Sequence, residues 1–138
     1  MMKMIHMFEK DIGLICSNVK ISKEMCEIRK IQNVSYYIDC LNFLSIYIRW
    51  NNWSIVNGKI DNTKPRFVIS NISVLEQFQC MGFFTCLIER LKYTCSLENV
   101  DLQVECVLDN RLQNFLEKQK FSSNNQTPPS FTWYNNIT

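Results

Sequence analysis

The sequence predicts a single-domain α/β (α+β) fold in which a mixed sheet is flanked by helices. Strand and helix patterns alternate through the second half of the chain, in the order strand, helix, strand, helix, strand. Alternation of this kind is typical of layered folds in which helices cover a sheet. The length of 138 residues suits one core, and an apolar share of 46% with a charged share of 20% is ordinary for a globular protein.

The first part of the chain carries weaker signals. Ser22 is a candidate N-cap for a short helix whose inner face would carry Met25, Ile28 and Ile31. From residue 44 to residue 50, apolar and polar side chains alternate, and this period of two predicts a strand. Short helices and strands are therefore expected in this region.

A hairpin is predicted directly after this strand. Asn57-Gly58 is the strongest turn signal in the chain, because both residue types tolerate the positive φ that a two-residue hairpin turn requires. The flanking segments, residues 53–56 and 59–60, have strand patterns. Residues 62–65 are expected to form a loop before the next strand.

The second half of the chain has clearer periodicity. β-Branched runs and alternation predict strands, a spacing of three and four predicts helices, and paired prolines predict a loop. The expected elements are a strand at 67–74, a helix at 82–93, a strand at 100–108, a helix at 110–119 capped by Asp109, a loop at 122–130 and a strand at 131–134.

Composition and charge exclude several classes of protein. The net charge is +2, and the 15 basic side chains form no basic stripe, so a nucleic-acid partner is not expected. No apolar run reaches the ~18 residues of a membrane span, so no membrane partner is expected either. The first residues are followed at once by Glu9, Lys10 and Asp11, which is unlike a signal peptide, and we expect a cytoplasmic protein.

The cysteines favour neither a metal site nor a disulfide framework. There are seven of them with no CxxC pair, and the one histidine, His6, is remote in sequence from most of them. Most thiols are therefore expected to be reduced and partly buried. The chain contains no alanine and little glycine, which indicates an A+T-rich genome such as that of a phage, a virus or a parasite.

A short loop between the predicted strand at 67–74 and the helix that follows carries the main chemical signal. A polar residue, two spacers and a glycine, Gln79-Cys80-Met81-Gly82, lead into Phe83, Phe84 and Thr85 at the start of the helix. The first N–H groups of a helix are unpaired and lie at the positive end of its dipole, so they can bind a phosphate. Glycine allows the ligand to approach the backbone closely. A glycine before a helix can equally be a simple turn.

Two motifs resemble the GCN5-related N-acetyltransferases (GNAT superfamily). Gln79-Cys80-Met81-Gly82-Phe83-Phe84 is similar to the family's Q/R-x-x-G-x-G/A loop, which holds the pyrophosphate of acetyl-CoA, although Phe84 replaces the last small residue. Residues 104–121 resemble a family segment, a strand and a helix, whose pattern ends in N-x-R-L-x-x-F-L-x-x-x-G-F. Arg111, Leu112, Phe115, Leu116 and Phe121 match this pattern, whereas Asp109 replaces Asn and Lys120 replaces Gly.

The resemblance implies a fold, a co-substrate and a set of binding residues. It covers residues 66–121 as the acyl-CoA-binding half of one GNAT-like domain, with 1–65 unmatched and 122–138 forming a loop and a C-terminal strand. The strand before the loop should bulge and splay from its neighbour, so that the pantetheine arm can insert like an added strand. The implied acetyl-CoA contacts are Ile72, Val74, Gln79, Cys80, Met81, Gly82, Phe83, Phe84 and Thr85. No metal is implied.

The family's usual acid and base are missing from this sequence. Where its fourth strand often supplies a Glu, this chain offers Ser70, Asn71 and Ser73, and Leu116 stands where its last helix often supplies a Tyr. Substitutes exist, each with a structural alternative: Glu105 (base, or a solvated strand residue), Asp109 (base, or a helix cap), Cys106 (proton donor, or core) and Tyr134 (proton donor, or structural). Similarly, Trp50, Trp53 and Trp133 could line a substrate pocket or belong to the core and its rim.

Two functions follow from the resemblance and its gaps. The first is an N-acyltransferase that moves an acetyl group from acetyl-CoA to an amine on a small molecule or a protein. The alternative is a catalytically inactive protein of the same fold that acts by protein–protein binding, such as a phage or viral host-directed factor. A homodimer through the aromatic segment Phe131–Tyr134 is a further hypothesis.

Overall fold

A computed structural model describes most of the chain, namely residues 2–38, 44–56, 58–61, 63–74, 82–105, 107 and 109–135. Three helices and eight strands lie within these residues. In chain order they are α1 (Met2–Arg29), β1 (Asn33–Ile38), β2 (Leu44–Asn51), β3 (Ser54–Val56), β4 (Lys59–Asp61), β5 (Arg66–Val74), α2 (Phe83–Glu98), β6 (Asp101–Val104), α3 (Asn110–Lys118), β7 (Ser122–Ser123) and β8 (Phe131–Trp133).

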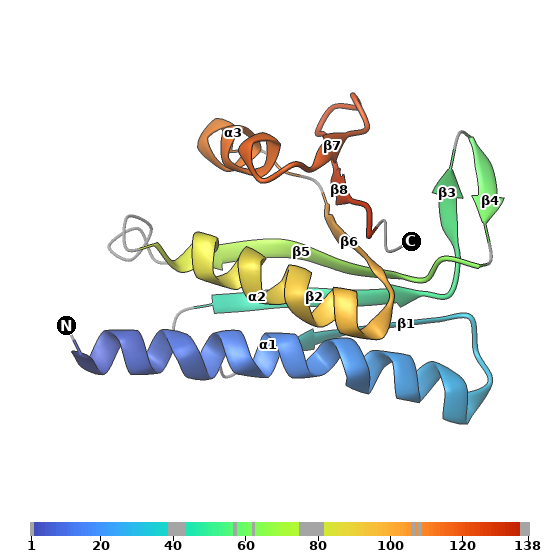
Figure 1. Ribbon diagram of the computed structural model, residues 1–138, viewed down its shortest axis with the longest axis horizontal. Coiled ribbons are helices and arrows are strands. Elements are labelled where there is room, and N and C mark those ends of the chain that lie inside the picture. Colours follow the sequence, from blue (N-terminus) through green and yellow to red (C-terminus); the bar gives the residue numbers. More distant parts are fainter. Residues whose placement is uncertain are drawn as a thin grey trace.

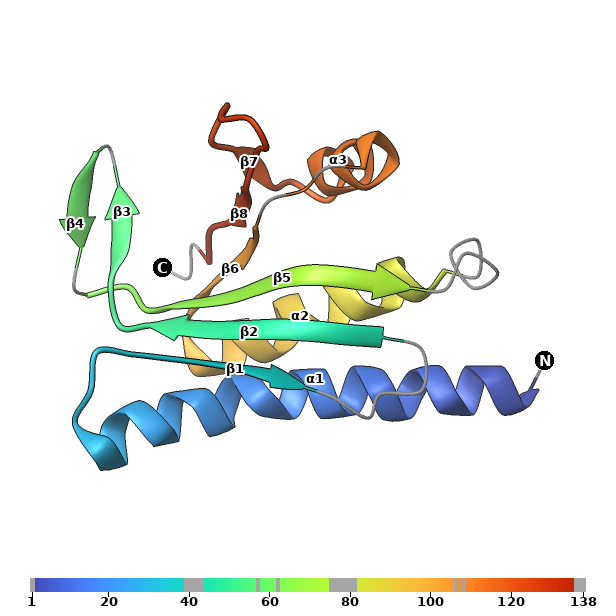
Figure 2. The ribbon, with the colours of Figure 1, turned by 180° about the vertical axis from the view of Figure 1, so that it is seen from behind.

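Six strands form one mixed sheet in the order β1-β2-β5-β6-β8-β7. Neighbours are antiparallel except β5 and β6, which are parallel and joined through α2. Helices α1 and α2 lie side by side on one face of the sheet, in front of it in Figure 1 and behind it in Figure 2. The remaining strands, β3 and β4, form a separate hairpin. The predicted fold class, an α/β domain with a mixed sheet and flanking helices, is confirmed.

The core lies between the sheet and the two helices. Its largest fully buried side chains come from β2, β5, α2 and β8, namely Trp50, Phe67, Phe83 and Phe131. Three isoleucines of β2 and β5, Ile46, Ile48 and Ile69, are also buried. Burial alternates along β2, as expected of a strand with one face turned to a helical layer, whereas residues 66–70 of the central strand β5 are all buried.

Helix α1 is much longer than the short helix that the sequence predicted. The predicted helix at Ser22 is the last part of a much longer helix that begins at Met2, and Ser22 is a buried residue inside it. The expected inner face was also wrong, because Ile28 is largely exposed while Ile15 and Val19 are buried. The helix ends where Lys30 adopts a positive φ of 55° and the Ile31 N–H donates to the carbonyl oxygen of Cys26 (3.1 Å).

Most other predicted elements are present with shifted ends. The hairpin forms with Gly58 at φ 76°, while Asn57 lies outside the described residues. Helix α2 continues past the expected end at Tyr93 to Glu98, because Asn99 supplies the left-handed C-cap. The strand expected at 100–108 ends already at Val104. Two residues of the expected loop at 122–130 pair with β8 as β7, which the sequence did not predict.

Candidate functional site

The parallel strands β5 and β6 separate partway along β5. Their register runs from Arg66 opposite Asp101 to Ile69 opposite Val104, and the Glu105 N–H then donates to the Ile69 carbonyl oxygen (2.9 Å). Strand β5 continues to Val74, paired on its other side with β2. Within the described residues, the last part of β5 therefore has a strand neighbour on one side only. A strand edge of this kind can hydrogen-bond an extended ligand.

The same part of β5 contains a β-bulge. Ser45 of β2 lies opposite Ser73 and Tyr47 lies opposite Ser70, so one residue of β2 faces two residues of β5, Asn71 and Ile72. Ile72 is thus at the bulge, and Val74 ends the strand opposite Leu44. A bulge bends a strand and turns some of its backbone groups out of the ladder. The bulge and the separation from β6 are the two features that the sequence resemblance implies for this strand.

Helix α2 begins at a glycine and has no side-chain N-cap among the described residues. Gly82 adopts the left-handed conformation (φ 73°, ψ 11°), and its carbonyl oxygen accepts the first helical hydrogen bond from the Cys86 N–H (3.1 Å). A Cβ atom at Gly82 would meet nothing within 4 Å among the described atoms, so the space beside this residue is open. The first turn contains no acidic residue. The positive end of the helix dipole lies at this turn and favours an anion.

The residues next to Gly82 have different roles. Phe83 is buried in the core, packed edge-to-face with the half-buried Phe84 at a ring distance of 5.7 Å, whereas Thr85 is exposed. The Phe83 side chain is therefore part of the core. Gln79, Cys80 and Met81, which carry much of the sequence motif, lie outside the described residues.

Glu105 lies where the two strands separate and is paired with Arg49. The Arg49 guanidinium donates through Nη2 to Glu105 Oε1 at 2.5 Å, and the side chains are 35% and 22% exposed. Arg49 comes from β2, so its side chain reaches across β5 to make this contact. Its Nε atom is buried and makes no hydrogen bond to a described residue. Glu105 is thus a partnered carboxylate rather than a freely solvated one, and the sequence did not predict Arg49 as its partner.

The other two candidate catalytic residues lie elsewhere. Asp109 caps α3, because its Oδ1 accepts from the Arg111 N–H (2.7 Å), as the sequence predicted. Tyr134 directly follows β8. Because Trp133 lies opposite Leu102 in the pairing of β8 with β6, Tyr134 comes level with Asp101. Glu105 is four residues further along that strand, so roughly 13 Å separates the two backbone positions at ~3.3 Å per residue. The structure therefore does not bring Tyr134 and Glu105 together, and Cys106 lies outside the described residues.

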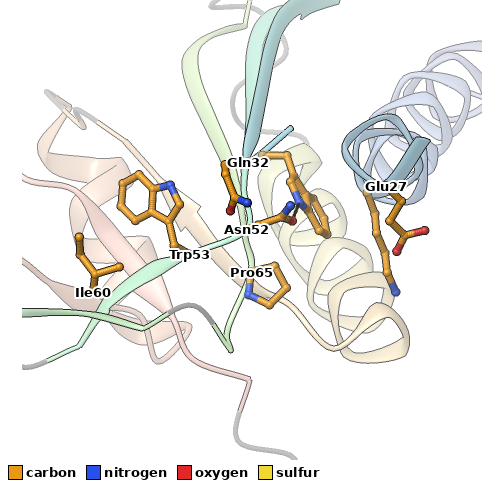
Figure 3. Close-up of a pocket in the computed structure, with 8 residues that line it drawn as sticks. Glu27, Gln32, Asn52, Trp53, Ile60 and Pro65 are labelled. Carbon is orange, nitrogen blue, oxygen red and sulfur yellow. Dashed lines mark hydrogen bonds between the residues drawn. The ribbon is translucent and has the colours of Figure 1, made fainter. Parts of the chain in front are cut away.

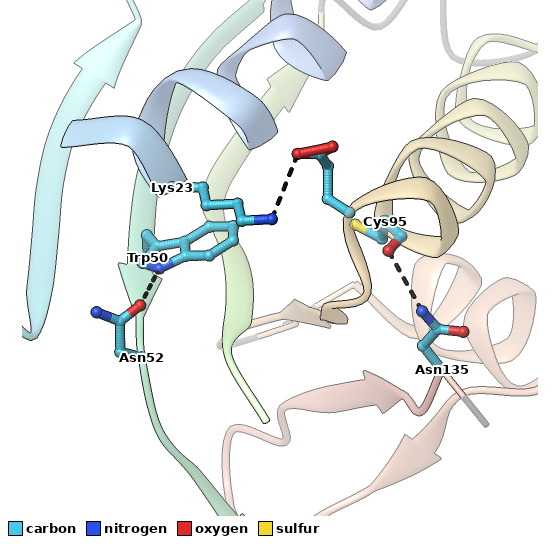
Figure 4. A network of polar contacts seen from close by, with 6 residues as sticks. Lys23, Trp50, Asn52, Cys95 and Asn135 are labelled. Atoms are coloured by element: carbon cyan, nitrogen blue, oxygen red, sulfur yellow. Dashed lines mark hydrogen bonds and ion pairs between the residues drawn. The ribbon is translucent and has the colours of Figure 1, made fainter. Parts of the chain in front are cut away.

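A hollow of about 800 Å³ lies at the opposite end of β5, next to Pro65. Figure 3 shows Trp53, Ile60 and Pro65 on one side of it and Glu27 of α1 on the other. Trp50 is a buried residue that also lines it, and its Nε1 donates to Asn52 Oδ1 (2.7 Å) (Figure 4). Trp50 in the core and the half-buried Trp53 therefore both line a hollow, so for these two residues a structural position and a place beside a hollow occur together.

Polar contacts at this end of the molecule join α1 to α2 and α2 to the chain after β8. An ion pair between Lys23 and Glu98 (3.7 Å) links α1 to α2, and the Asn135 amide donates to the Cys95 carbonyl oxygen (3.3 Å) (Figure 4). The Asn135 N–H also donates to the buried Asp101 carboxylate (2.8 Å). These contacts hold the start of β6 and the chain after β8 against the end of α2, so this end of the molecule is a structural junction.

The described cysteines are free thiols. Cys16, Cys26 and Cys95 are buried and Cys86 is exposed. Burial raises the pKa of Cys16 and, most strongly, that of Cys95. No group of three or more His, Cys, Asp or Glu residues that could hold a metal ion occurs in the described part of the chain. None of its helices is long and apolar enough to cross a membrane.

Comparisons with known proteins give similarity to solved structures alone. No protein-family model and no curated protein matches the sequence. A structure of a mutant AtaT toxin bound to the C-terminus of the antitoxin AtaR has a TM-score of 0.46 at 13% identity, over 67% of this chain and 66% of that one. Ard1 from Thermoplasma volcanium has a TM-score of 0.40 at 17% identity, over 64% of this chain and 66% of that one.

A third solved structure has a comparable level of similarity. Arabidopsis thaliana Naa50 in complex with the bisubstrate analogue CoA-Ac-MVNAL has a TM-score of 0.43 at 15% identity, over 65% of this chain and 62% of that one. The present chain thus spans slightly less than two thirds of each of these three chains.

Proposed function

We propose that this chain binds acetyl-CoA in the gap between β5 and β6 and transfers its acetyl group to an amine. The observation that carries the proposal is the coincidence of three features along one stretch of chain. Strand β5 bulges at Asn71 and Ile72, it separates from β6 after Ile69, and the next helix begins at the left-handed Gly82. The GNAT-like sequence motif lies across this same stretch, from residue 66 to residue 121.

Two groups of residues would bind two different parts of acetyl-CoA. The edge of β5 that has no strand neighbour within the described residues, with the backbone groups of Ile72 and Val74, would hydrogen-bond the extended pantetheine arm as an added strand would. The N-terminal turn of α2, through the backbone N–H groups of Phe84 and Thr85 next to Gly82, would hold the pyrophosphate without a charged side chain. The open space beside Gly82 fits this role, because a ligand must approach the backbone closely there. Gln79, Cys80 and Met81 would complete the loop, as the motif implies.

The proposed reaction is direct acyl transfer. Acetyl-CoA supplies a thioester; the nitrogen of a neutral amine forms a bond to its acyl carbon, the carbon–sulfur bond breaks, and CoA leaves as a thiolate. The amine must lose one proton, and Glu105 is the described carboxylate at the start of the gap, so we assign it as the base acting through water. Backbone N–H groups at the bulge would stabilise the oxyanion.

A second candidate function is favoured by a separate observation. Glu105 is already bound to Arg49, and Tyr134 lies roughly 13 Å further along the sheet, at ~3.3 Å per residue. With the acid and base apart in this way, the chain could keep the same fold and bind CoA or a protein without turnover. A host-directed binding factor of a phage or virus would fit this alternative.

Calorimetric titration with acetyl-CoA and with CoA tests the proposal. A Gly82→Glu variant should lose measurable binding, because it places a negative charge and a side chain where the pyrophosphate would lie. Tyr93→Glu is the matched control, since Tyr93 is an exposed residue on the same helix, away from its N-terminus, and this variant should bind like wild type. A non-Gly residue at positive φ costs ~1–2 kcal/mol, so thermal unfolding must show that Gly82→Glu is folded.

The outcomes separate the two functions. Binding that is lost in Gly82→Glu and kept in Tyr93→Glu supports the CoA site, and release of CoA in an amine acceptor screen would then support the enzyme. Binding with no turnover across a broad screen favours the inactive alternative. If the folded wild-type protein binds neither compound, the acyl-CoA proposal is wrong.

A further inference from the structure

Helix α1 carries an exposed apolar stripe. The stripe consists of three exposed residues spaced seven apart, Leu14 (43% exposed), Ile21 (44%) and Ile28 (81%). Because seven residues are nearly two turns of an α-helix, these three side chains lie on one side of α1 with only a slight drift. Spacing of this kind is typical of a helix that packs lengthwise against another helix.

The stripe borders the side of α1 that faces strand β1. The Tyr36 hydroxyl donates to Asn18 Oδ1 (2.7 Å) and is 2.8 Å from Ser22 Oγ, so Asn18 and Ser22 face this strand. Leu14 lies four residues before Asn18, and residues four apart are neighbours on a helix surface. The opposite side of α1 contacts α2, where Lys23 pairs with Glu98. The stripe therefore runs along the rim of the molecule that α1 and β1 form (Figures 1 and 2).

Strand β1 is the outermost strand at this rim. It is paired with β2 on one side and has no strand neighbour on the other within the described residues. Its sequence, Asn-Val-Ser-Tyr-Tyr-Ile, contains no charged residue and no proline. Exposed edge strands commonly carry charges, prolines or bulges that prevent pairing with another chain, and β1 has none of these in its register with β2.

We propose that a second copy of this chain docks on this rim, with α1 against α1 and β1 against β1 in antiparallel pairs about one two-fold axis. A two-fold axis requires the middle of the stripe and the middle of the strand edge to lie at the same level. The Tyr36 contacts place the centre of β1 level with residues 18–22 of α1, next to Ile21, the middle residue of the stripe. Leu14 then faces Ile28 of the partner subunit, and Ile21 faces its own copy.

Charge and area both fit a second copy. An uncharged strand can pair with itself without repulsion between like charges. The exposed parts of the stripe residues Leu14, Ile21 and Ile28 amount to about 340 Å², if a large apolar residue exposes ~200 Å² in full. A standard dimer buries roughly 800 Å² on each partner, and the polar side chains and backbone of β1 would supply the remainder. This inference is independent of the proposed acetyl-CoA site.

Light scattering after size exclusion, over a dilution series, tests the proposal. Wild type should have twice the chain mass of 16.4 kDa at high concentration. Ile21→Glu and Ile21→Lys should each raise the dimer dissociation constant by at least about 100-fold, because like charges would meet and be buried on the axis. Tyr93→Glu, an equally exposed apolar-to-acidic change on α2, should leave the dimer intact.

Mixing the two variants tests the axis itself. Because Ile21 would face Ile21, an equimolar mixture of Ile21→Glu and Ile21→Lys should recover the dimer mass, while each variant alone stays monomeric. Circular dichroism checks that both variants keep their helices. The proposal is overturned if wild type is monomeric at every concentration, as expected if another protein covers this rim, or if a dimer survives both charge variants. It is also overturned if the mixture stays monomeric.

Discussion

The contact between Arg49 and Glu105 leads to a prediction about stability. Glu105→Gln keeps the size of the side chain and one acceptor oxygen but removes its negative charge. The hydrogen bond at 2.5 Å then becomes a bond to a neutral acceptor, and the buried Nε of Arg49 still has no hydrogen-bond partner among the described residues. A hydrogen bond to a charged group contributes ~1.5–3 kcal/mol and a neutral one ~0.5–1.5 kcal/mol.

The expected loss is the difference between these ranges, reduced by solvent. Because the Arg49 side chain is about a third exposed, we expect Glu105→Gln to lower the free energy of unfolding by about 1 kcal/mol, or the melting temperature by roughly 3 °C. Urea unfolding followed by tryptophan fluorescence measures this change. Glu117→Gln, which neutralises an exposed carboxylate on α3, is the matched control and should be near neutral.

A double-mutant cycle with Arg49→Met isolates the contact. Glu105→Gln should cost much less in the Arg49→Met background than in wild type, giving a coupling energy of about 1 kcal/mol, and high salt should reduce it only partly because the pair is partly buried. If the two substitutions add to within ~0.3 kcal/mol, the two side chains do not interact in solution and the assignment of Arg49 as the partner of Glu105 is wrong.

Three further predictions concern helix α3 and the thiols. Asp109→Ala should lower the free energy of unfolding by about 1 kcal/mol in urea titrations, because the Arg111 N–H loses its capping acceptor, whereas Asp109→Asn should cost much less. In the folded protein, Cys86 should react with a thiol reagent while Cys16 and Cys95 stay protected, and early labelling of Cys95 would contradict its burial. Burial raises the pKa of Cys16 and Cys95 above the ordinary value near 9. Below pH 9 these thiols are protonated in both the folded and the unfolded state and should not change the folding stability, whereas above pH 9 they ionise more readily in the unfolded state, so the stability should fall. A stability that stays constant above pH 9 would contradict their burial.

The sequence predicted those elements whose signals are local. Three signals depend on only a few neighbouring residues: the Asn57-Gly58 turn, the alternation in β2 and the cap at Asp109. The structure contains strand β2, the hairpin strands β3 and β4, and the Asp109 cap of α3. Helix α1 was mostly missed because its inner face includes polar residues. Asn18 and Ser22 interrupt the apolar period, and their partner, Tyr36, belongs to a strand that sequence periodicity cannot place beside them.

The candidate site was only partly predictable for the same reason. The position of Gly82 at the start of a helix follows from its neighbours, and the structure places it there. The end of β6 at Val104 depends on where β5 and β6 cease to pair, so the predicted strand to residue 108 was too long. Arg49 lies 56 residues before Glu105 and meets it across an intervening strand, and no spacing rule connects them.

The contact between Arg49 and Glu105 also bears on the choice between the two proposed functions. In an enzyme, Arg49 would act as a positioning residue that holds the Glu105 carboxylate at the start of the gap, where the amine must lose its proton. In an inactive protein, the same contact would only join β2 to the end of β6. Both cases predict the loss of stability described above, so stability cannot separate them. The two cases differ in one variant, because Glu105→Gln should abolish CoA release in the enzyme while acetyl-CoA binding at α2 stays as in wild type. Turnover that persists in this variant would remove Glu105 from the mechanism and leave the base to another residue.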